Sequence, residues 1–138
     1  MPEPNPERAA LRFVNRINRH DVPAITAMMA PGIRFVDSLG HEVRGINRLR
    51  AGWHAYFALF PDYQITIHEH FRVGQVVALF GTARGTLAEN GKMPRRNHWA
   101  MPAAWRAVVR RGRLVHWQVY ADNTPVARLL SDRGAQLV

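Results

Sequence analysis

The sequence predicts an α+β fold in which three helices come first and cover one face of a curved antiparallel sheet that follows them. Two observations lead to this expectation. Apolar residues recur at helical spacing as far as Phe60, whereas from Tyr63 onward they alternate with polar residues at a period of two. The 138 residues contain no linker and no internal repeat, and 47% of them are hydrophobic, so we expect residues 1–138 to form a single domain with an ample core.

Three helices are predicted ahead of the sheet. Asn5 is a cap followed by a proline in the first turn, which predicts a helix over residues 5–19. Asp21 caps a second, shorter helix that Pro31-Gly32 ends. A third helix over residues 46–60 has an apolar stripe that is too bulky for a helix facing solvent.

Later segments predict a meander of long antiparallel strands. The first of these strands alternates apolar and polar residues and is therefore half-exposed, whereas the second is apolar on both faces and therefore central. A polar loop with Asn90-Gly91 at its tip follows the second strand. The expected strands cover residues 63–73, 76–87, 99–109 and 114–121, and the loop covers residues 88–97.

A further strand over residues 33–40 carries the sharpest chemical signal. Side chains alternate between the faces of a strand, so Ile33, Phe35 and Asp37 share one face. Burying an ionised carboxylate is costly unless it is paired or its pKa rises, so such an acid is either a satisfied structural group or a proton carrier. We expect Asp37 to be largely buried, with a raised pKa, and to face a cavity lined by the first and third helices.

The formal net charge of +9 arises almost entirely from arginines, since Lys92 is the only lysine. A basic surface of this kind can indicate nucleic-acid binding, because arginines neutralise phosphates and release counterions. Here the arginines are scattered, and only Arg95-Arg96 and residues 110–113 form clusters, both in expected loops or turns. An arginine-rich solvated surface is therefore favoured over a nucleic-acid partner.

Composition excludes several other classes of protein. No apolar run approaches the ~18 residues that a membrane span needs, so we expect a soluble protein without a membrane partner. The chain has no cysteine, which excludes disulfides and thiolate chemistry. Residues 1–4 lack the basic start and apolar core of a signal peptide, which makes a cytoplasmic location the expectation.

The segment from Phe35 to Gly40, followed by Arg44-Gly45, resembles the part of ketosteroid isomerases in which an acid precedes a turn and an Arg-Gly helix start. The order of helices and strands resembles the nuclear transport factor two-like superfamily, which includes SnoaL-like polyketide cyclases. The resemblance implies a cone-shaped, cystatin-like α+β roll with its core over about residues 7–130. It also implies that Asp37 is a general base that moves a proton next to a carbonyl group.

Other positions depart from the isomerase pattern. The tyrosine and the protonated aspartate that polarise the isomerase's substrate correspond to Phe13 and approximately Ala104 here, and neither side chain donates a hydrogen bond. Losing even one such donor costs about two or three orders of magnitude in rate, so ketosteroid isomerisation itself is not expected. The supporting tyrosine on the third helix corresponds to Trp53, which keeps an aromatic wall and offers an indole donor.

Two further residues are catalytic candidates. The stretch from Trp117 to Asn123 resembles the closing strand of SnoaL-like proteins, where an acid follows a tryptophan, and this implies a role for Asp122. Asp122 lies at an odd offset from Trp117 and needs a bulge or a strand end to point inward. Histidines titrate near neutrality, so His98 could assist proton transfer, although it also fits an exposed residue at the end of a loop.

His68 and His70 share the polar face of one predicted strand and in principle could share a metal ion. A metal site requires a third and a fourth ligand, and the sequence places none beside them, so two solvent-facing or interface histidines are favoured. We expect neither a metal nor an organic cofactor.

Aromatic residues belong first of all to the core, and some of them are expected to line an apolar cavity between the helices and the sheet. The expected chemistry is cofactor-independent general acid–base catalysis, of an isomerase, cyclase or dehydratase type, on a small hydrophobic carbonyl compound. The alternative is a non-catalytic domain of the same fold that binds a hydrophobic ligand or serves assembly. The expected wall residues are Phe13, Phe35, Trp53, Phe57, Phe60, Phe80 and Trp117.

The predicted sheet is apolar on more than one face, since Val77 and Leu79 oppose Phe80 on one strand. Helices cover only one face, so we expect a twofold homodimer in which the outer faces of two sheets pack together. The resemblance agrees, since relatives commonly dimerise in this way. The expected contact includes Tyr120 and His116, with His68 and His70 as further candidates.

Overall fold

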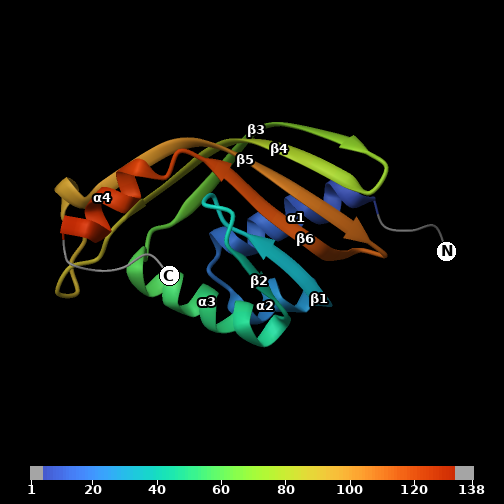
Figure 1. The fold of residues 1–138 in the computed structure, drawn as a ribbon, viewed down its shortest axis with the longest axis horizontal. Coiled ribbons are helices and arrows are strands. Elements are labelled where there is room, and N and C mark those ends of the chain that lie inside the picture. The colour runs from blue at the N-terminus through green and yellow to red at the C-terminus, as the bar shows by residue number, and fades with distance from the viewer. Residues whose placement is uncertain (1–4, 133–138) are drawn as a thin grey trace.

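Six strands form one curved sheet in the order β2-β1-β6-β5-β4-β3, and the helices pack on one of its faces (Figure 1). The structure, a computed structural model, describes residues 5–132. Neighbouring strands are antiparallel except for β1 and β6, which are parallel. The predicted α+β fold is therefore confirmed.

The bounds of the predicted elements agree with the structure to within a few residues, apart from the exceptions below, whereas β2 and η1 lie in segments that were predicted as connections. The helices are α1 (Pro6–Asn18), α2 (Val22–Ala27), α3 (Ile46–Leu59), η1 (Arg95–Asn97) and α4 (Thr124–Asp132). The strands are β1 (Met29–Val36), β2 (Glu42–Arg44), β3 (Gln64–Val73), β4 (Val76–Thr86), β5 (His98–Arg110) and β6 (Arg113–Ala121). None of the described helices is long and apolar enough to span a membrane.

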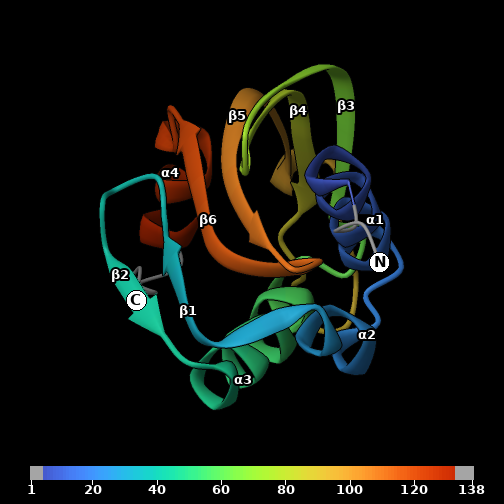
Figure 2. The same cartoon turned by 90° about the vertical axis from the view of Figure 1, so that its right-hand side faces the viewer.

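Helix α1 lies along the sheet and covers β3, β4 and β5 (Figure 2). Its buried stripe includes Ala10, Phe13 and Ile17, which recur at helical spacing and face the core. The Oδ1 atom of Asn5 accepts a hydrogen bond from the backbone N–H of Glu7 at 2.9 Å, so the predicted cap is confirmed.

The end of α1 is fixed to the start of β3. The side-chain amide of Asn18 donates to the carbonyl oxygen of Ile65 and accepts the N–H of Ile65, each at 2.8 Å. His20, in the left-handed region at a φ of 56°, donates from Nε2 to the carbonyl oxygen of Tyr63 at 2.8 Å. These bonds hold the start of β3 against the helices, and they place Tyr63 in the interior.

The second helix is shorter than predicted. Asp21 caps α2 as expected, since its Oδ1 accepts the N–H of Ala24 at 3.1 Å, but α2 ends at Ala27 and Pro31-Gly32 lies inside β1. The reason is a tertiary contact, because Met29 is completely buried and pairs with β6. The register between β1 and β6 is irregular after Met29, so a proline without an N–H is tolerated there.

A β-bulge at His68 changes which way the side chains of β3 point. Ile67 pairs with Gly81 and Glu69 pairs with Phe80, so His68 is an extra residue in the ladder. From Glu69 onward the faces of β3 are exchanged relative to a regular strand. The alternation that the sequence predicts for this strand is therefore right only for its first half.

The exchange moves apolar side chains to the outer face of the sheet, the face away from α1. Phe71 and Val73 are 57% and 82% exposed, although the alternation predicts that they face inward. His70 instead pairs with Leu79, whose side chain is buried, and its Nδ1 is hydrogen-bonded to the carboxylate of Glu7 on α1. His70 therefore does not belong to the outer face, where it was expected as a dimer-contact candidate.

Helix α4 is an element that the sequence pattern did not predict. It follows β6 and packs Val126 and Leu130 inward at one end of the sheet (Figure 1). Thr124-Pro125 is the local signal for a helix start, because proline is favoured in the first turn. The stretch after β6 therefore closes the end of the sheet instead of extending the strand.

The bulge depends on the absence of a side chain at Gly81. A Cβ atom built on Gly81 would lie 1.8 Å from the carbonyl oxygen of Thr66. We expect Gly81→Ala to lower the free energy of unfolding in urea by about 1–3 kcal/mol or more, because the backbone has to move. The control is Gly52→Ala on α3, where nothing lies within 4 Å and the substitution should stabilise by about 0.5–1 kcal/mol. Equal stabilities of the two variants would contradict this account of the bulge.

Candidate functional site

A continuous run of aromatic side chains, here called the aromatic layer, connects α3 with β1 at one end and with β5 at the other. Aromatic rings bury large apolar areas and prefer edge-to-face or offset contacts, so such a run packs densely. Its members are Phe35, Trp53, Tyr56, Phe57, Phe60, Tyr63 and Trp99.

The contacts in the aromatic layer follow one another ring to ring. Phe35 meets Trp53 edge-on, with 6.0 Å between the ring centroids. Tyr56 lies 6.2 Å from Trp53 and 4.9 Å from Tyr63. Trp99 lies 6.0 Å from Tyr63 at the far end. The layer therefore brings indole and phenol groups into the apolar interior.

Two indole N–H groups in the layer have no acceptor. The Nε1 atoms of Trp53 and Trp99 are buried and make no hydrogen bond with any described residue. Leaving a buried donor unsatisfied costs about 1–3 kcal/mol. Native structures pair most buried donors, so these two mark a place where a polar acceptor from outside the chain would be stabilised.

The two phenols of the layer lie in or against the core, with Tyr63 buried and Tyr56 partly buried. The hydroxyls of Tyr56 and Tyr63 hydrogen-bond each other. Burial is the largest cause that raises the pKa of both groups above the ordinary value for tyrosine. Both side chains therefore remain neutral hydrogen-bonding groups around neutral pH.

The structure does not bury Asp37 as predicted. β1 ends at Val36, and the side chain of Asp37 is 34% exposed at the start of the turn that leads to β2. Its Oδ1 accepts the backbone N–H groups of Leu39 and His41, both at 2.9 Å. Its Oδ2 accepts no backbone hydrogen bond from residues 5–132, and the Nδ1 of His41 lies 3.5 Å away. Asp37 is thus a satisfied turn residue that keeps one carboxylate oxygen available.

Asp122 points away from the interior. It is exposed, and its Oδ1 accepts the hydroxyl of Thr124 at 2.5 Å and the N–H of Thr124 at 3.0 Å. The hydroxyl hydrogen bond, followed by the backbone one, holds the pKa of Asp122 below its ordinary value. Asp122 therefore organises the start of α4, and neither a bulge nor the strand end turns it inward.

His98 lies at the start of β5 in a separate polar chain. Its Nδ1 is 3.1 Å from the Oγ1 of Thr86, which donates to the Oδ2 of Asp62 at 2.7 Å. The Oδ1 of Asp62 accepts the N–H of Thr86, also at 2.7 Å. No hydrogen bond or ion pair within residues 5–132 joins His98 to Asp37 or Asp122.

The predicted wall residues divide between the two faces of the sheet. Phe80 is 40% exposed on the outer face, with its ring 6.2 Å from that of Phe71, so it does not line the interior. Phe13 and Trp117 form a buried pair on the helix side, with 4.9 Å between centroids. The remaining predicted wall residues, Phe35, Trp53, Phe57 and Phe60, belong to the aromatic layer.

Two hollows of the described chain lie outside the aromatic layer. One, of about 380 Å³, lies between α2 and α3, and another, of about 680 Å³, lies on the outer face of the sheet. Neither is the predicted cavity between the first and third helices. Aromatic rings occupy that region instead.

The histidine pair of β3 is separated by the bulge. The Nε2 of His68 lies 3.2 Å from the Oγ1 of Thr82, whereas His70 bonds to Glu7. Within residues 5–132, no three His, Asp or Glu side chains gather closely enough to hold a metal ion.

One known protein family matches most of this sequence. The sequence profile of the SnoaL-like domain family matches residues 10–117, which is well over half of the chain. The chain belongs to the SnoaL-like domain family. No curated protein matches this SnoaL-like domain by sequence.

Solved structures resemble the SnoaL-like domain at low sequence identity. A protein from Shewanella denitrificans assigned as a SnoaL-like polyketide cyclase is 16% identical at a TM-score of 0.79, over 92% of this chain and 97% of its own. An NTF2-like protein of unknown function from Burkholderia pseudomallei is 19% identical at a TM-score of 0.78, over 93% of this chain and 98% of its own. A protein with a ketosteroid isomerase-like fold from Catenulispora acidiphila, in complex with trimethylamine, is 16% identical at a TM-score of 0.73, over 93% of each chain. These likenesses establish the NTF2-like fold.

Three residues of the aromatic layer were missing from the site that the sequence predicts for this SnoaL-like domain. They are Tyr56, Tyr63 and Trp99. For two of them the signal is the two-residue period of a strand. Tyr63 shares a face with the buried Ile65, and Trp99 shares a face with the buried Met101. Tyr56 belongs to the apolar stripe of α3, a pattern that predicts where its ring packs but not what its hydroxyl contacts.

The buried tyrosine pair predicts how stability depends on pH. The pKa values of Tyr56 and Tyr63 are raised in the folded protein, so the unfolded chain loses these protons first as the pH rises through about 10. The contribution of the two protonated tyrosines to the free energy of unfolding is complete below that pH and is lost as the pH rises above it. We expect the free energy of unfolding in urea to fall above about pH 10, and to fall less in Tyr63→Phe. Replacing the exposed Tyr120 by Phe is the control, and a slope unchanged by Tyr63→Phe would contradict the prediction.

Proposed function

We propose that this SnoaL-like domain is a cofactor-independent acid–base enzyme that moves a proton next to the carbonyl group of a small apolar compound. The observation that carries the proposal is the buried indole N–H of Trp53, which has no acceptor among the described residues. Phe35 contacts Trp53 and precedes Asp37 by two residues, which is about 7 Å along an extended chain. A donor and a base are thus available at one end of the aromatic layer.

Each group has a defined role in the proposed reaction. The Oδ2 of Asp37 takes a proton from the carbon next to the carbonyl, and the bonding electrons move to the carbonyl oxygen. The indole N–H of Trp53 donates to that oxygen as its negative charge develops. Protonated Asp37 then returns the proton to the product. Isomerisation, cyclisation and dehydration of carbonyl compounds share this first step.

The substrate class follows from the surroundings of Trp53. The rings that contact it are aromatic and uncharged, so a compound without charge is favoured there. Phe35 and Phe57 are only partly buried, which makes their displacement the route of entry for a ligand. The alternative function is ligand binding without catalysis, and the turn-forming hydrogen bonds of Asp37 favour it because they give that residue a purely structural role.

The proposed proton transfer can be measured without the natural substrate. In D₂O the enzyme should exchange the protons next to the carbonyl of 1-tetralone, an apolar ketone, as followed by the loss of their NMR signal. Asp37→Asn should slow the exchange by about 100-fold or more, because the base is lost. Trp53→Phe should slow it by about 100- to 1,000-fold through the loss of the donor. The control is Asp132→Asn, an exposed carboxylate on α4.

Three outcomes decide between the candidates. Exchange that depends on both Asp37 and Trp53 supports the enzyme. Binding of the ketone without exchange supports the ligand-binding domain. Exchange that survives Asp37→Asn contradicts the assignment of the base.

We also propose that a second copy of the chain covers one apolar row on the outer face of the sheet. Phe80, Ala104 and Tyr120 stand in register across β4, β5 and β6, and they form a row with Phe80 and Tyr120 40% and 50% exposed. Glu69 ends this row on β3. A twofold axis at the row would bury it against the same row of the second copy.

Light scattering tests the dimer. We expect a mass of twice the 15.7 kDa of one chain at micromolar concentration. Phe80→Glu should give a monomer, because it buries a charge in the contact. The matched control is Leu59→Glu, at an apolar residue on α3 that is also 40% exposed. A monomeric wild type, or a Phe80→Glu variant that stays dimeric, would refute this contact.

A further inference from the structure

A groove of about 680 Å³ crosses the outer face of the sheet, on the side opposite the aromatic layer. β1, β4, β5 and β6 all contribute to its lining. Val76, Val108, His116 and Arg34 stand in register across these four strands. Val115, the extra residue of a second bulge, adds another apolar side chain. The groove thus has an apolar floor with a polar end at β1.

The lining of the groove contains three arginines and no carboxylate. Two of the arginines have partners among the described residues. The Nε of Arg110 donates to the Oε1 of Gln75 at 3.1 Å. The Nε and Nη2 of Arg34 donate to the two carboxylate oxygens of Glu42 at 2.8 and 3.0 Å.

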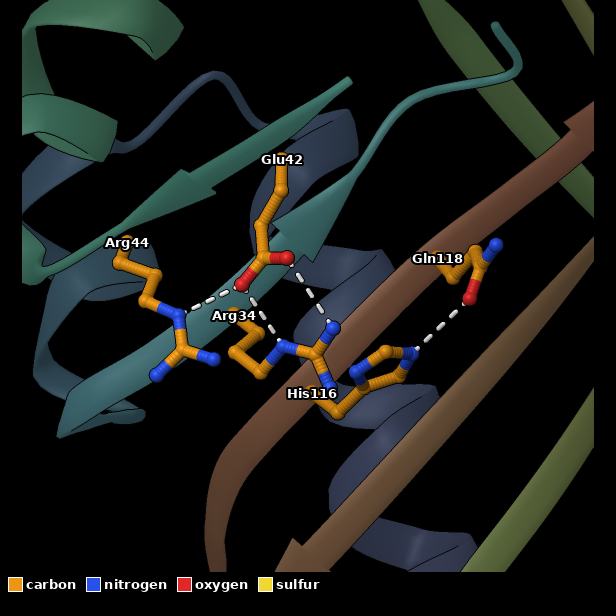
Figure 3. Close-up of polar contacts among 5 residues, drawn as sticks. All are labelled: Arg34, Glu42, Arg44, His116 and Gln118. Carbon is orange, nitrogen blue, oxygen red and sulfur yellow. Dashed lines mark hydrogen bonds and ion pairs between the residues drawn. The ribbon is translucent and has the colours of Figure 1, made fainter. Parts of the chain in front are cut away.

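Glu42 does not cancel the positive charge of the groove. It also accepts the Nε of Arg44 at 2.5 Å, so one carboxylate serves two guanidinium groups (Figure 3). Hydrogen bonds from Arg34 first, and then from Arg44, lower the pKa of Glu42 to about 2. Arg106, in the middle of the groove, makes no hydrogen bond or ion pair with any residue within 5–132. An unpaired cation therefore stands beside the apolar floor.

His116 lies beside the arginines of the groove. Its side chain is nearly buried, and its Nε2 lies 3.1 Å from the Oε1 of Gln118 (Figure 3). An amide oxygen only accepts, so Nε2 carries the proton and Nδ1 is an acceptor in the neutral ring. Burial first, and then the nearby charges of Arg106 and Arg34, lower the pKa of His116, against the opposing effects of Gln118 and Glu42.

We propose that this groove binds a small amphipathic carboxylate, with its anionic group on Arg106 and its apolar part on Val76, Val108 and Val115. A planar guanidinium offers paired N–H donors that match a carboxylate. The volume lies within the range of about 300–1,000 Å³ that is usual for small-molecule sites. The site is independent of the proposed proton transfer, because it lies on the other face of the sheet.

Calorimetric titration with octanoate at low ionic strength tests the proposal. Octanoate should bind, and 1-octanol, which has the same chain without a charge, should bind at least tenfold more weakly. Arg106→Gln should weaken octanoate binding at least tenfold. The matched control is Arg84→Gln, which removes an arginine on the same outer face but outside the groove and should change Kd less than twofold. Trp53→Phe should also leave Kd unchanged, because Trp53 lies in the aromatic layer.

A second readout follows the ring of His116 by NMR. The charged groups that face it are Arg34 from β1, Glu42 from β2 and Arg106 from β5, with Gln118 on its own strand. Bound octanoate offsets the arginine charges, so it should raise the pKa of His116, whereas 1-octanol should not. No octanoate binding, equal binding of 1-octanol, or binding insensitive to Arg106→Gln would overturn the proposal. A loss of binding in Arg106→Gln that accompanies a changed oligomeric mass would overturn it as well, because Arg106 would then act in the subunit contact.

Discussion

The packing of the aromatic layer against α3 and the sheet is the constraint on which the rest of this structure depends. Its rings bury enough apolar surface to connect α3 with β1 and β5, but they bring indole and phenol groups into a region where the neighbours are other rings. The phenols of Tyr56 and Tyr63 satisfy each other, whereas the indoles of Trp53 and Trp99 find no acceptor in the described part of the chain. A cost of about 1–3 kcal/mol for each unpaired donor is balanced by burial of the rings, and the donors remain available to a ligand.

The two faces of the sheet differ because of its bulges. The bulge at His68 turns Phe71 and Val73 outward, and it requires Gly81 on the neighbouring strand. A second bulge at Val115 places that side chain in the basic groove. The helix side thus offers neutral donors in an apolar interior, whereas the outer side offers positive charge beside an apolar row. The same sheet can therefore serve chemically different ligands on its two faces.

Local patterns predicted the parts of the fold that local interactions determine. The Asn5 cap, the apolar stripe of α1 and the approximate extents of β4, β5 and β6 need only the sequence around them. The His68 bulge depends instead on a glycine from another strand, and the position of Pro31 inside β1 depends on pairing with β6. The predicted burial of Asp37 failed for a related reason, since strand parity holds only as far as Val36 and the turn beyond it takes the carboxylate. The sequence could not predict that the indole N–H groups of Trp53 and Trp99 are unpaired, because this depends on which acceptors the fold brings near them.

The most direct test of the central claim is the ¹H–¹⁵N spectrum of the four tryptophan indoles, recorded with and without 1-tetralone. The signal that disappears in Trp53→Phe belongs to the donor in question. This account predicts that the Trp53 N–H is protected from exchange with solvent and that its proton signal moves downfield when the ketone is added, because a hydrogen bond forms. The signals of Trp105 and Trp117 should stay in place. A Trp53 signal that exchanges rapidly with solvent, or that does not move at a saturating concentration of ketone, would contradict the account.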